Sequence, residues 1–121
     1  MKIVVGGQIN KKEIAQFIKD HSNAEVEIKN DLDAANGLKA GKYDYYVGAC
    51  MTGGGGALAM AMALLGRDLC QTISMPGKIS SDEDIVKAVN NNKKAFGFTA
   101  QHAEKVLPVL LQAIAEKEKK S

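Results

Sequence analysis

Short strand patterns alternate with helical patterns along the whole chain. Five runs rich in β-branched and aromatic residues predict strands, at Lys2–Val5, Ala24–Lys29, Tyr43–Ala49, Leu69–Ser74 and Ala95–Phe98. The segments between them carry apolar residues at the spacing of one helix face. Such alternation predicts a parallel sheet with helices on both faces. We expect a single α/β domain over residues 1–121, Rossmann-like in three layers, with four or five mainly parallel strands in flavodoxin-type order.

Five helices are expected between and after these strands. Helix starts are expected where a short polar side chain can accept a hydrogen bond from the first turn, at Asn10, at Ser80 or Ser81, and at Thr99. The last helix contains Pro108, which is expected to kink it or split it in two.

Composition excludes several classes of protein. The 121 residues are 45% apolar and 25% charged, which is the balance of a folded globular domain. The net charge is only +2 and Arg67 is the single arginine, so no basic surface for nucleic acid is expected. The longest uncharged apolar run, Ala57–Leu65, has about half the length of a membrane-spanning helix, and the first residues predict a strand rather than a signal peptide. The spacing of Cys50 and Cys70 suits neither a disulfide framework nor a zinc site. We therefore expect a cytoplasmic protein with no metal, no cofactor and no direct membrane insertion.

The segment 50–56, CMTGGGG, joins the third expected strand to an apolar helix. Four consecutive glycines lose much conformational entropy on folding, which suggests that their backbone closely approaches another group. N–H groups and the positive end of a helix dipole point out of such a loop, so an anion is the expected occupant. The segment lacks the lysine of a P-loop and does not follow the first strand, as a dinucleotide-binding loop does. Ligand contacts are expected at Gly53, Gly54, Gly55 and Gly56; alternatively, the glycines only permit tight packing of the helix on the sheet.

Ligands of parallel α/β sheets bind beyond the carboxyl ends of the strands. The other polar or unusual residues in the expected strand-end loops are therefore candidate ligand contacts: Gly7, Gln8, Asn30, Asp31, Lys78 and His102. Each also has an ordinary structural interpretation. Asn30 and Asp31 form a common turn and cap pair, and Lys78 and His102 can be solvated surface residues.

Cys50 lies where the third strand meets the glycine segment. The adjacent helix start can lower the pKa of a thiol, which would make Cys50 a base or a nucleophile. The alternative is a small buried apolar residue, which cysteine often is. Thr52 can donate a hydrogen bond to a ligand or cap the next helix. Cys50 and Thr52 are the candidate catalytic residues.

The chain resembles the YhfU-like family of uncharacterised bacterial proteins over nearly its whole length. The segment Asp44–Gly66 carries most of this resemblance, supported by Ile73–Ser80 and Ala95–Pro108. This resemblance implies no particular activity.

The segment CMTGGGGALAMA is also similar to the Cys-Gly-Thr-Gly loop of type B ribose-5-phosphate isomerases and their galactose-6-phosphate relatives. The resemblance implies that Cys50 transfers a proton and that amides of the loop stabilise the enediolate. Where those isomerases carry an Asp-His pair after the first strand, this chain has Gly6-Gly7-Gln8, and Met51 replaces the glycine after the cysteine. We expect a small anionic metabolite as ligand, a sugar phosphate or a carboxylate, and the resemblance implies isomerase-like proton transfer as the reaction.

The size and element order also resemble the small IIB phosphocarrier subunits of sugar phosphotransferase systems. Those proteins place a phosphorylated cysteine directly after the first strand, where this chain has Gly6. A phosphocarrier, or a non-catalytic sensing subunit that works with a transport system, is therefore the alternative function.

The expected helix Ala57–Leu65 is apolar on every face, which predicts that it is covered on every side. A second copy of the chain would provide that cover, so a homodimer is expected. The alternative is that the long C-terminal helix of the same chain covers it.

Overall fold

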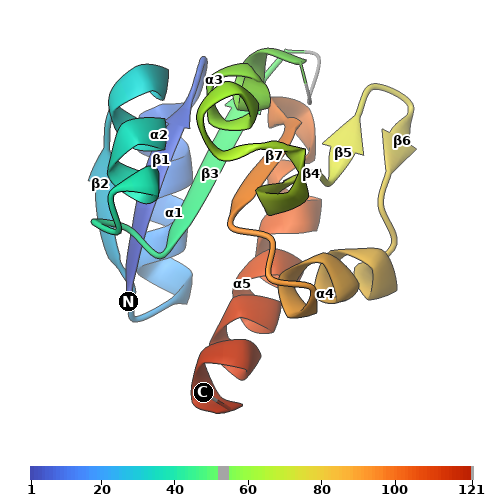
Figure 1. Ribbon diagram of the computed structural model, residues 1–121. Helices are drawn as coiled ribbons and strands as arrows, with labels where there is room; N and C mark the ends of the chain where they lie inside the picture. The colour runs from blue at the N-terminus through green and yellow to red at the C-terminus, as the bar shows by residue number, and fades with distance from the viewer. Residues whose placement is uncertain (52–54, 121) are drawn as a thin grey trace.

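The computed structural model describes residues 1–51 and 55–120 (Figure 1). Its centre is a five-stranded parallel sheet with the order β2-β1-β3-β7-β4. The strands of this sheet are β1 (Lys2–Gly7), β2 (Glu25–Ile28), β3 (Tyr45–Cys50), β4 (Cys70–Thr72) and β7 (Ala95–Thr99). A separate antiparallel hairpin is formed by β5 (Ser74–Met75) and β6 (Lys78–Ile79).

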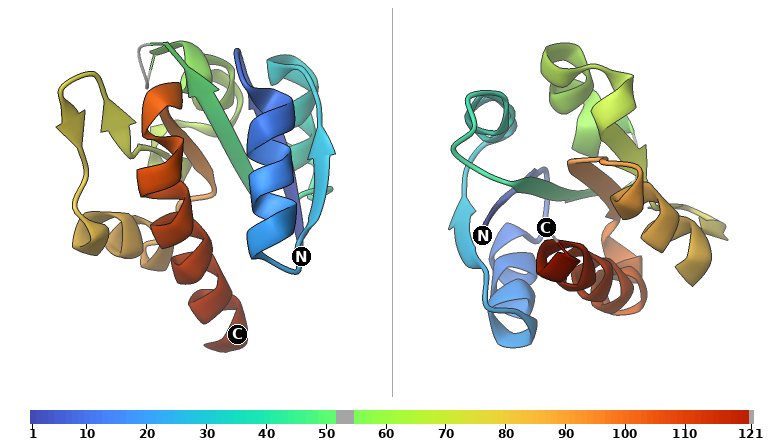
Figure 2. Two further views of the ribbon diagram at one scale, coloured as in Figure 1. Left: turned by 180° about the vertical axis from the view of Figure 1, so that it is seen from behind. Right: turned by 60° about the horizontal axis from the view of Figure 1, so that its bottom comes forward.

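Helices cover both faces of the sheet (Figure 2). The α-helices are α1 (Lys11–His21), α2 (Asp31–Lys39), α3 (Gly55–Leu65), α4 (Asp82–Asn90) and α5 (Ala103–Lys120), and two short 3-10 helices are η1 (Arg67–Leu69) and η2 (Ala100–His102). Helices α2 and α3 pack on one face, whereas α1, α4 and α5 pack on the other. The expected three-layer α/β fold is confirmed.

The expected flavodoxin-type order is wrong for the last two strands. Counted along the chain, the main-sheet strands lie in the order 2-1-3-5-4, whereas the flavodoxin-type order is 2-1-3-4-5. All five residues of β7 are buried, so this strand suits the inner position. Strand β4 has only three residues, of which Gln71 and Thr72 are half-buried, and a short, partly polar strand is suited to an edge.

Side chains of the strands alternate between two cores. The core under α1, α4 and α5 includes Val5, Val47 and Phe96. The core under α2 and α3 includes Val4 and Tyr46. Strands β1, β3 and β7 therefore each contribute apolar residues to both faces, as expected for a sheet buried on both sides.

The expected helix caps are confirmed at one of three positions. Ser81 Oγ accepts a hydrogen bond from the Asp84 N–H at 3.1 Å at the start of α4. The caps at Asn10 and Thr99 are wrong, because neither side chain makes a capping bond. Asn10 has a left-handed backbone, with φ of 56°, and Thr99 is the last residue of β7, with its side chain buried.

Helix α5 continues through Pro108, so the expected split of this helix is wrong. Proline cannot donate a backbone hydrogen bond to the carbonyl of Glu104, four residues earlier. Both residues are exposed, so water can hydrate that carbonyl. Within the described part of the chain, no helix has the length and apolar character that crossing a membrane requires.

Helix α3 leaves part of its apolar surface uncovered. Leu58 and Ala61 are buried, whereas Ala59 and Ala63 are exposed and Met60 is 38% exposed. The chain by itself therefore does not cover α3 on every side, and the expected cover by a second copy stays a prediction. The C-terminal helix does not cover it either, because α5 packs on the opposite face of the sheet (Figures 1 and 2).

Candidate functional site

The carboxyl ends of β1, β3 and β7 lie side by side at one edge of the sheet (Figure 1). Their register pairs Gly7 with Ala49, and Cys50 with Thr99. Side chains alternate along a strand, so Cys50 lies on the same face as Tyr46, under α2 and α3. Paired residues of parallel strands share a face, which places the Cys50 and Thr99 side chains next to each other.

The Cys50–Thr99 pair is buried. Cys50 is 1% exposed and Thr99 is 4% exposed. The Thr99 N–H donates a hydrogen bond to Ser74 Oγ at 2.9 Å, but Thr99 Oγ1 has no hydrogen-bond partner among the residues that the structure describes. A buried hydroxyl without a partner is unusual, because its lost hydration is not compensated. The Thr99 hydroxyl therefore has unused hydrogen-bonding capacity beside Cys50.

The hydroxyl of Tyr46 joins three elements beside this pair. It accepts a hydrogen bond from the Gly7 N–H at 3.0 Å, and it lies 2.7 Å from the Ala57 carbonyl oxygen and 3.1 Å from Asp31 Oδ1. A hydroxyl has one proton, so it donates to one of these two acceptors at a time. The network ties the end of β1 and the start of α2 to the first turn of α3.

Two glycines create the space for the Tyr46 ring. A Cβ atom on Gly6 would lie 2.6 Å from Tyr46 Cε2, and one on Gly48 would lie 3.1 Å from Tyr46 Cε1. The ring therefore lies against the sheet where two neighbouring strands lack side chains. Burial, together with the nearby Asp31 carboxylate, raises the pKa of Tyr46 above its ordinary value, so the hydroxyl stays protonated at neutral pH.

Several of the predicted ligand residues meet around this network. Gly7 and Asp31 are partners of the Tyr46 hydroxyl. The side-chain amide of Gln8 lies against the first turn of α3, where a Cβ atom on Gly56 would be 2.7 Å from its nitrogen and its oxygen. Gln8, Asp31 and Gly56 are thus brought to one edge of the sheet, although they are far apart in the sequence.

Asn30 serves a structural purpose at the start of α2. Its Oδ1 accepts a hydrogen bond from the Asp33 N–H at 2.8 Å, and its Nδ2 donates to Asp33 Oδ2 at 3.1 Å. The alternative interpretation of Asn30 as a cap residue therefore describes its present contacts. A ligand contact by Asn30 stays a prediction.

Lys78 and His102 belong to a second group. Together with Lys105 they line a cavity of about 480 Å³ between the hairpin and the start of α5. The lining of this cavity includes none of the partners of Tyr46. The Nδ1 atom of His102 is buried and has no hydrogen-bond partner in the described part of the chain.

The remaining predicted site residues fall at or beyond the limits of the described structure. Thr52, Gly53 and Gly54 lie outside the described residues, and Gly55 is the first residue of α3. Across residues 1–51 and 55–120, no cluster of histidine, cysteine, aspartate or glutamate side chains is arranged to hold a metal ion. Cys70 is buried in β4, and this burial raises the pKa of its thiol although Lys93 acts in the opposite direction.

Sequence reasoning missed Tyr46 and Thr99. The strand pattern predicts Tyr46 only as part of a strand, but the glycines at positions 6 and 48 are a usable signal, because strand glycines often mark the close approach of another group. The sequence predicts Thr99 as a helix cap, since it lies between a strand and a helix. Its pairing with Cys50 depends on the strand order, which the sequence did not indicate.

The sheet order and the layers define a Rossmann-like α/β protein with the fold of the type B ribose-5-phosphate isomerases. The solved enzyme from Giardia lamblia is 18% identical, with a TM-score of 0.70 over 95% of this chain and 94% of that chain. The enzyme from Clostridium thermocellum is 17% identical, with a TM-score of 0.66 over the whole of both chains. The enzyme from Trypanosoma brucei is 14% identical, with a TM-score of 0.63 over 95% of this chain and 85% of that chain.

Sequence comparison then assigns the family. The family model described as "Protein of unknown function DUF2620" matches residues 1–114, and the chain belongs to this family. It is 45% identical to the uncharacterized protein YhfU of Escherichia coli K12 over 87 residues, which are 72% of this chain and 74% of that protein. The YhfU protein of Shigella flexneri matches with the same identity and coverage. These matches confirm the resemblance to the YhfU-like family.

Proposed function

We propose that this protein binds a small anionic metabolite, a sugar phosphate or a related carboxylate, at the carboxyl ends of β3 and β7. The buried Thr99 hydroxyl, which lies beside Cys50 and has no partner among the described residues, is the observation that carries the proposal. An oxygen of the ligand would accept the hydrogen bond that this hydroxyl does not make within the chain. The fold shared with the type B ribose-5-phosphate isomerases supports a sugar phosphate as the ligand class.

The first turn of α3 favours a negatively charged ligand. Unsatisfied N–H groups and the positive end of the helix dipole lie at the start of a helix. Helix α3 begins at Gly55, and the Gln8 side-chain amide lies against Gly56. A ligand carboxylate or phosphate beside Cys50 would have these donors within reach.

Cys50 is the proposed base for an aldose–ketose isomerisation. Its thiolate would take a proton from the carbon next to the substrate carbonyl, and the electron pair of that C–H bond would form an enediolate. Transfer of the hydroxyl proton from the neighbouring oxygen to the former carbonyl oxygen, together with return of the first proton to the former carbonyl carbon, would complete the isomerisation without any change in the total number of electrons. Donors at the start of α3 would stabilise the enediolate oxygen.

Burial of Cys50 argues against a phosphocarrier. A phosphocarrier cysteine must meet the active site of a second protein, whereas Cys50 is 1% exposed. A non-catalytic sensor of the same ligand class would need the hydrogen-bond donors of the site but not the Cys50 thiol, so an experiment that removes the thiol distinguishes an enzyme from a sensor.

Exchange of a substrate proton tests this proposal. We expect at least one compound from a panel of pentose phosphates, hexose phosphates and hydroxycarboxylates to raise the melting temperature. That compound should exchange its α-proton in deuterated water, and Cys50→Ala should slow the exchange by about 100-fold or more. Mass spectrometry of the recovered compound measures the exchange.

Cys70→Ala is the matched control, because Cys70 is a second buried thiol in a neighbouring part of the same sheet. It should leave the exchange rate unchanged. If no compound in the panel raises the melting temperature, the metabolite site is contradicted. Binding without exchange would contradict the catalytic proposal and support the sensor.

We further propose that the exposed face of α3 is covered by a second copy of the chain in a two-fold dimer. The exposed residues on this face are Ala59, Met60 and Ala63, small or flexible apolar side chains that suit close helix packing.

A negative charge introduced on this face of α3 should dissociate the dimer. Sedimentation equilibrium should give twice the chain mass of 12.9 kDa for the native protein and the single chain mass for Met60→Glu. Val86→Glu is the control, because Val86 is also 38% exposed on a helix but lies on α4. A native protein with the mass of one chain at all concentrations would contradict the dimer.

A further inference from the structure

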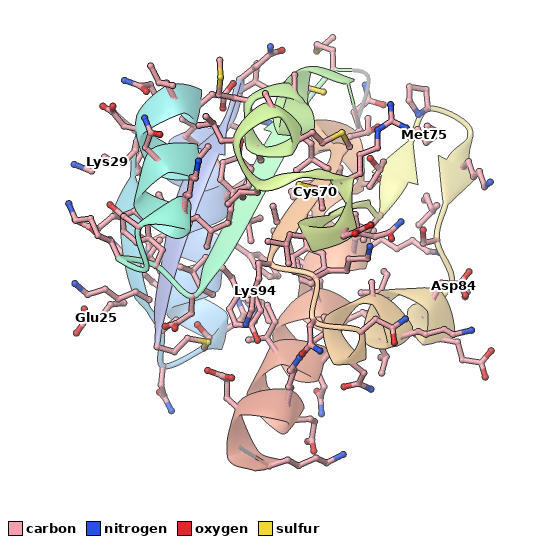
Figure 3. All side chains as sticks on the ribbon, in the orientation of Figure 1. Glu25, Lys29, Cys70, Met75, Asp84 and Lys94 are labelled. Carbon is pink, nitrogen blue, oxygen red and sulfur yellow. The ribbon has the colours of Figure 1, made fainter. Side chains whose placement is uncertain are left out.

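A groove of about 500 Å³ lies along the free edge of the sheet. Its walls are edge strand β4, the β5–β6 hairpin and helix α4, and Figure 3 shows Met75 on the hairpin and Asp84 near the start of α4. Met75, Ile79 and Ala88 contribute apolar surface to the groove. The groove is thus a partly apolar channel beside a strand that has a neighbour on one side only.

The main chain of β4 directs a carbonyl group outward at this edge. The Ile73 N–H donates to the Gly97 carbonyl in β7 at 2.8 Å. In a trans peptide the C=O and the N–H point in opposite directions, so the Thr72 carbonyl points away from β7, toward the groove. The Gln71 side-chain amide donates to this carbonyl at 3.1 Å. A side chain therefore occupies the position where the N–H of an additional strand would lie.

The hairpin limits how much of the edge is open. The Ser80 N–H donates to the Ile73 carbonyl at 3.0 Å, so the chain itself covers the edge beyond Thr72. The open part is β4, which is three residues long. A partner strand at this edge would make few main-chain hydrogen bonds, and its specificity would depend on the side chains around the groove.

The charged residues of the groove are mostly cationic. Lys78, Lys87 and Lys93 line it, and Asp84 is the one acidic residue in the lining. An occupant with carboxylates on its solvent side and an apolar residue toward Ile79 and Ala88 would complement both the charge and the apolar surface.

We propose that β4 pairs with an extended acidic segment of a partner protein, which adds a strand to the sheet at this groove. A main-chain N–H of the segment replaces the Gln71 amide on the Thr72 carbonyl. Carboxylates of the segment face the three lysines. A small organic acid could neutralise the lysines, but it would not supply the main-chain N–H that the Thr72 carbonyl can accept.

An oriented peptide library tests the proposal. The library consists of hexapeptides in which Asp or Glu alternates with Val, Ile or Thr, and the native protein is titrated with each pool while its amide NMR signals are followed. We expect a pool to bind with a dissociation constant of about 10–100 μM, since the interface is small. The signals of Gln71, Thr72 and the groove lysines should shift.

Two modifications separate strand pairing from charge attraction. N-methylation of alternate residues in the best peptide should weaken binding about tenfold or more, because it removes main-chain donors. Lys87→Glu and Lys93→Glu should each weaken binding about tenfold, whereas Lys12→Glu on α1 should not. The proposal is overturned if no pool binds or if the N-methylated peptide binds as tightly as its parent. It is equally overturned if glutarate alone shifts the same signals at concentrations equal to those of the peptide.

Discussion

Replacing Gly7 with alanine is expected to lower the free energy of unfolding by about 3 kcal/mol or more. Gly7 has a φ of +79°, and a Cβ atom there would lie 2.6 Å from the Ala49 backbone nitrogen and 2.7 Å from its oxygen. Backbone atoms of the neighbouring strand cannot rotate away, so β1 and β3 would have to separate at the candidate site. Urea unfolding, followed by circular dichroism, measures the change.

Gly41→Ala is the matched control for this variant. Gly41 has a nearly identical φ of +82°, but a Cβ atom there would meet nothing within 4 Å. Gly41→Ala should lower the free energy of unfolding only by the backbone strain of a left-handed alanine, about 1–2 kcal/mol. Equal losses for the two variants would contradict the close contact between Gly7 and Ala49.

Tyr46→Phe is expected to lower the free energy of unfolding by about 2–3 kcal/mol. The substitution removes only the hydroxyl, but it leaves the buried Gly7 N–H without its acceptor and removes the donor that the Ala57 carbonyl and Asp31 share. These groups connect β1 to the first turn of α3. Hydrogen exchange at the start of α3 should therefore become faster in the variant.

Tyr45→Phe is the control, because it removes a buried tyrosine hydroxyl from the same strand without breaking the hydrogen bonds of Tyr46. Tyr45 is also fully buried in β3, but its hydroxyl has no hydrogen-bond partner in the part of the chain that the structure describes. Removing it should leave the stability unchanged or raise it by up to about 1 kcal/mol, since a buried hydroxyl without a partner is costly. A loss for Tyr45→Phe as large as that for Tyr46→Phe would contradict the importance of the Tyr46 network.

The Tyr46 hydrogen bonds also affect ligand binding at the proposed site. Tyr46 fixes the end of β1 and the first turn of α3, and Cys50 lies four residues further along the same strand. A variant with Tyr46→Phe that still folds should bind a metabolite more weakly, because the donors at the start of α3 would be less well ordered.

The local sequence determined the helices and the main-sheet strands. It also determined that the candidate residues gather at the carboxyl-terminal end of the sheet. Alternation of β-branched runs with helical patterns is a property of neighbouring residues, so the strands of the main sheet and the helices could be predicted without their partners. The carboxyl ends of parallel strands always meet at one edge, so residues such as Gly7, Gln8, Asp31 and Cys50 could be predicted to lie there.

Only the tertiary structure decided the order of the last strands and the contacts at the site. The inner position of β7 depends on its burial between two layers of helices, and the pairing of Cys50 with Thr99 follows from that position. Lys78 and His102 instead line a separate cavity beside the hairpin, which no local pattern indicated.

The Tyr46 network shows most clearly why local sequence patterns do not predict the contacts at the site. Its hydroxyl bonds join residues 11 to 39 positions apart, and its ring occupies space left by Gly6 and by Gly48. Propensity and periodicity describe a residue with its near neighbours, so they predicted Tyr46 as part of a strand. Its place in the candidate site depends on how α2, α3 and β1 pack around it, and that packing is a property of the whole fold.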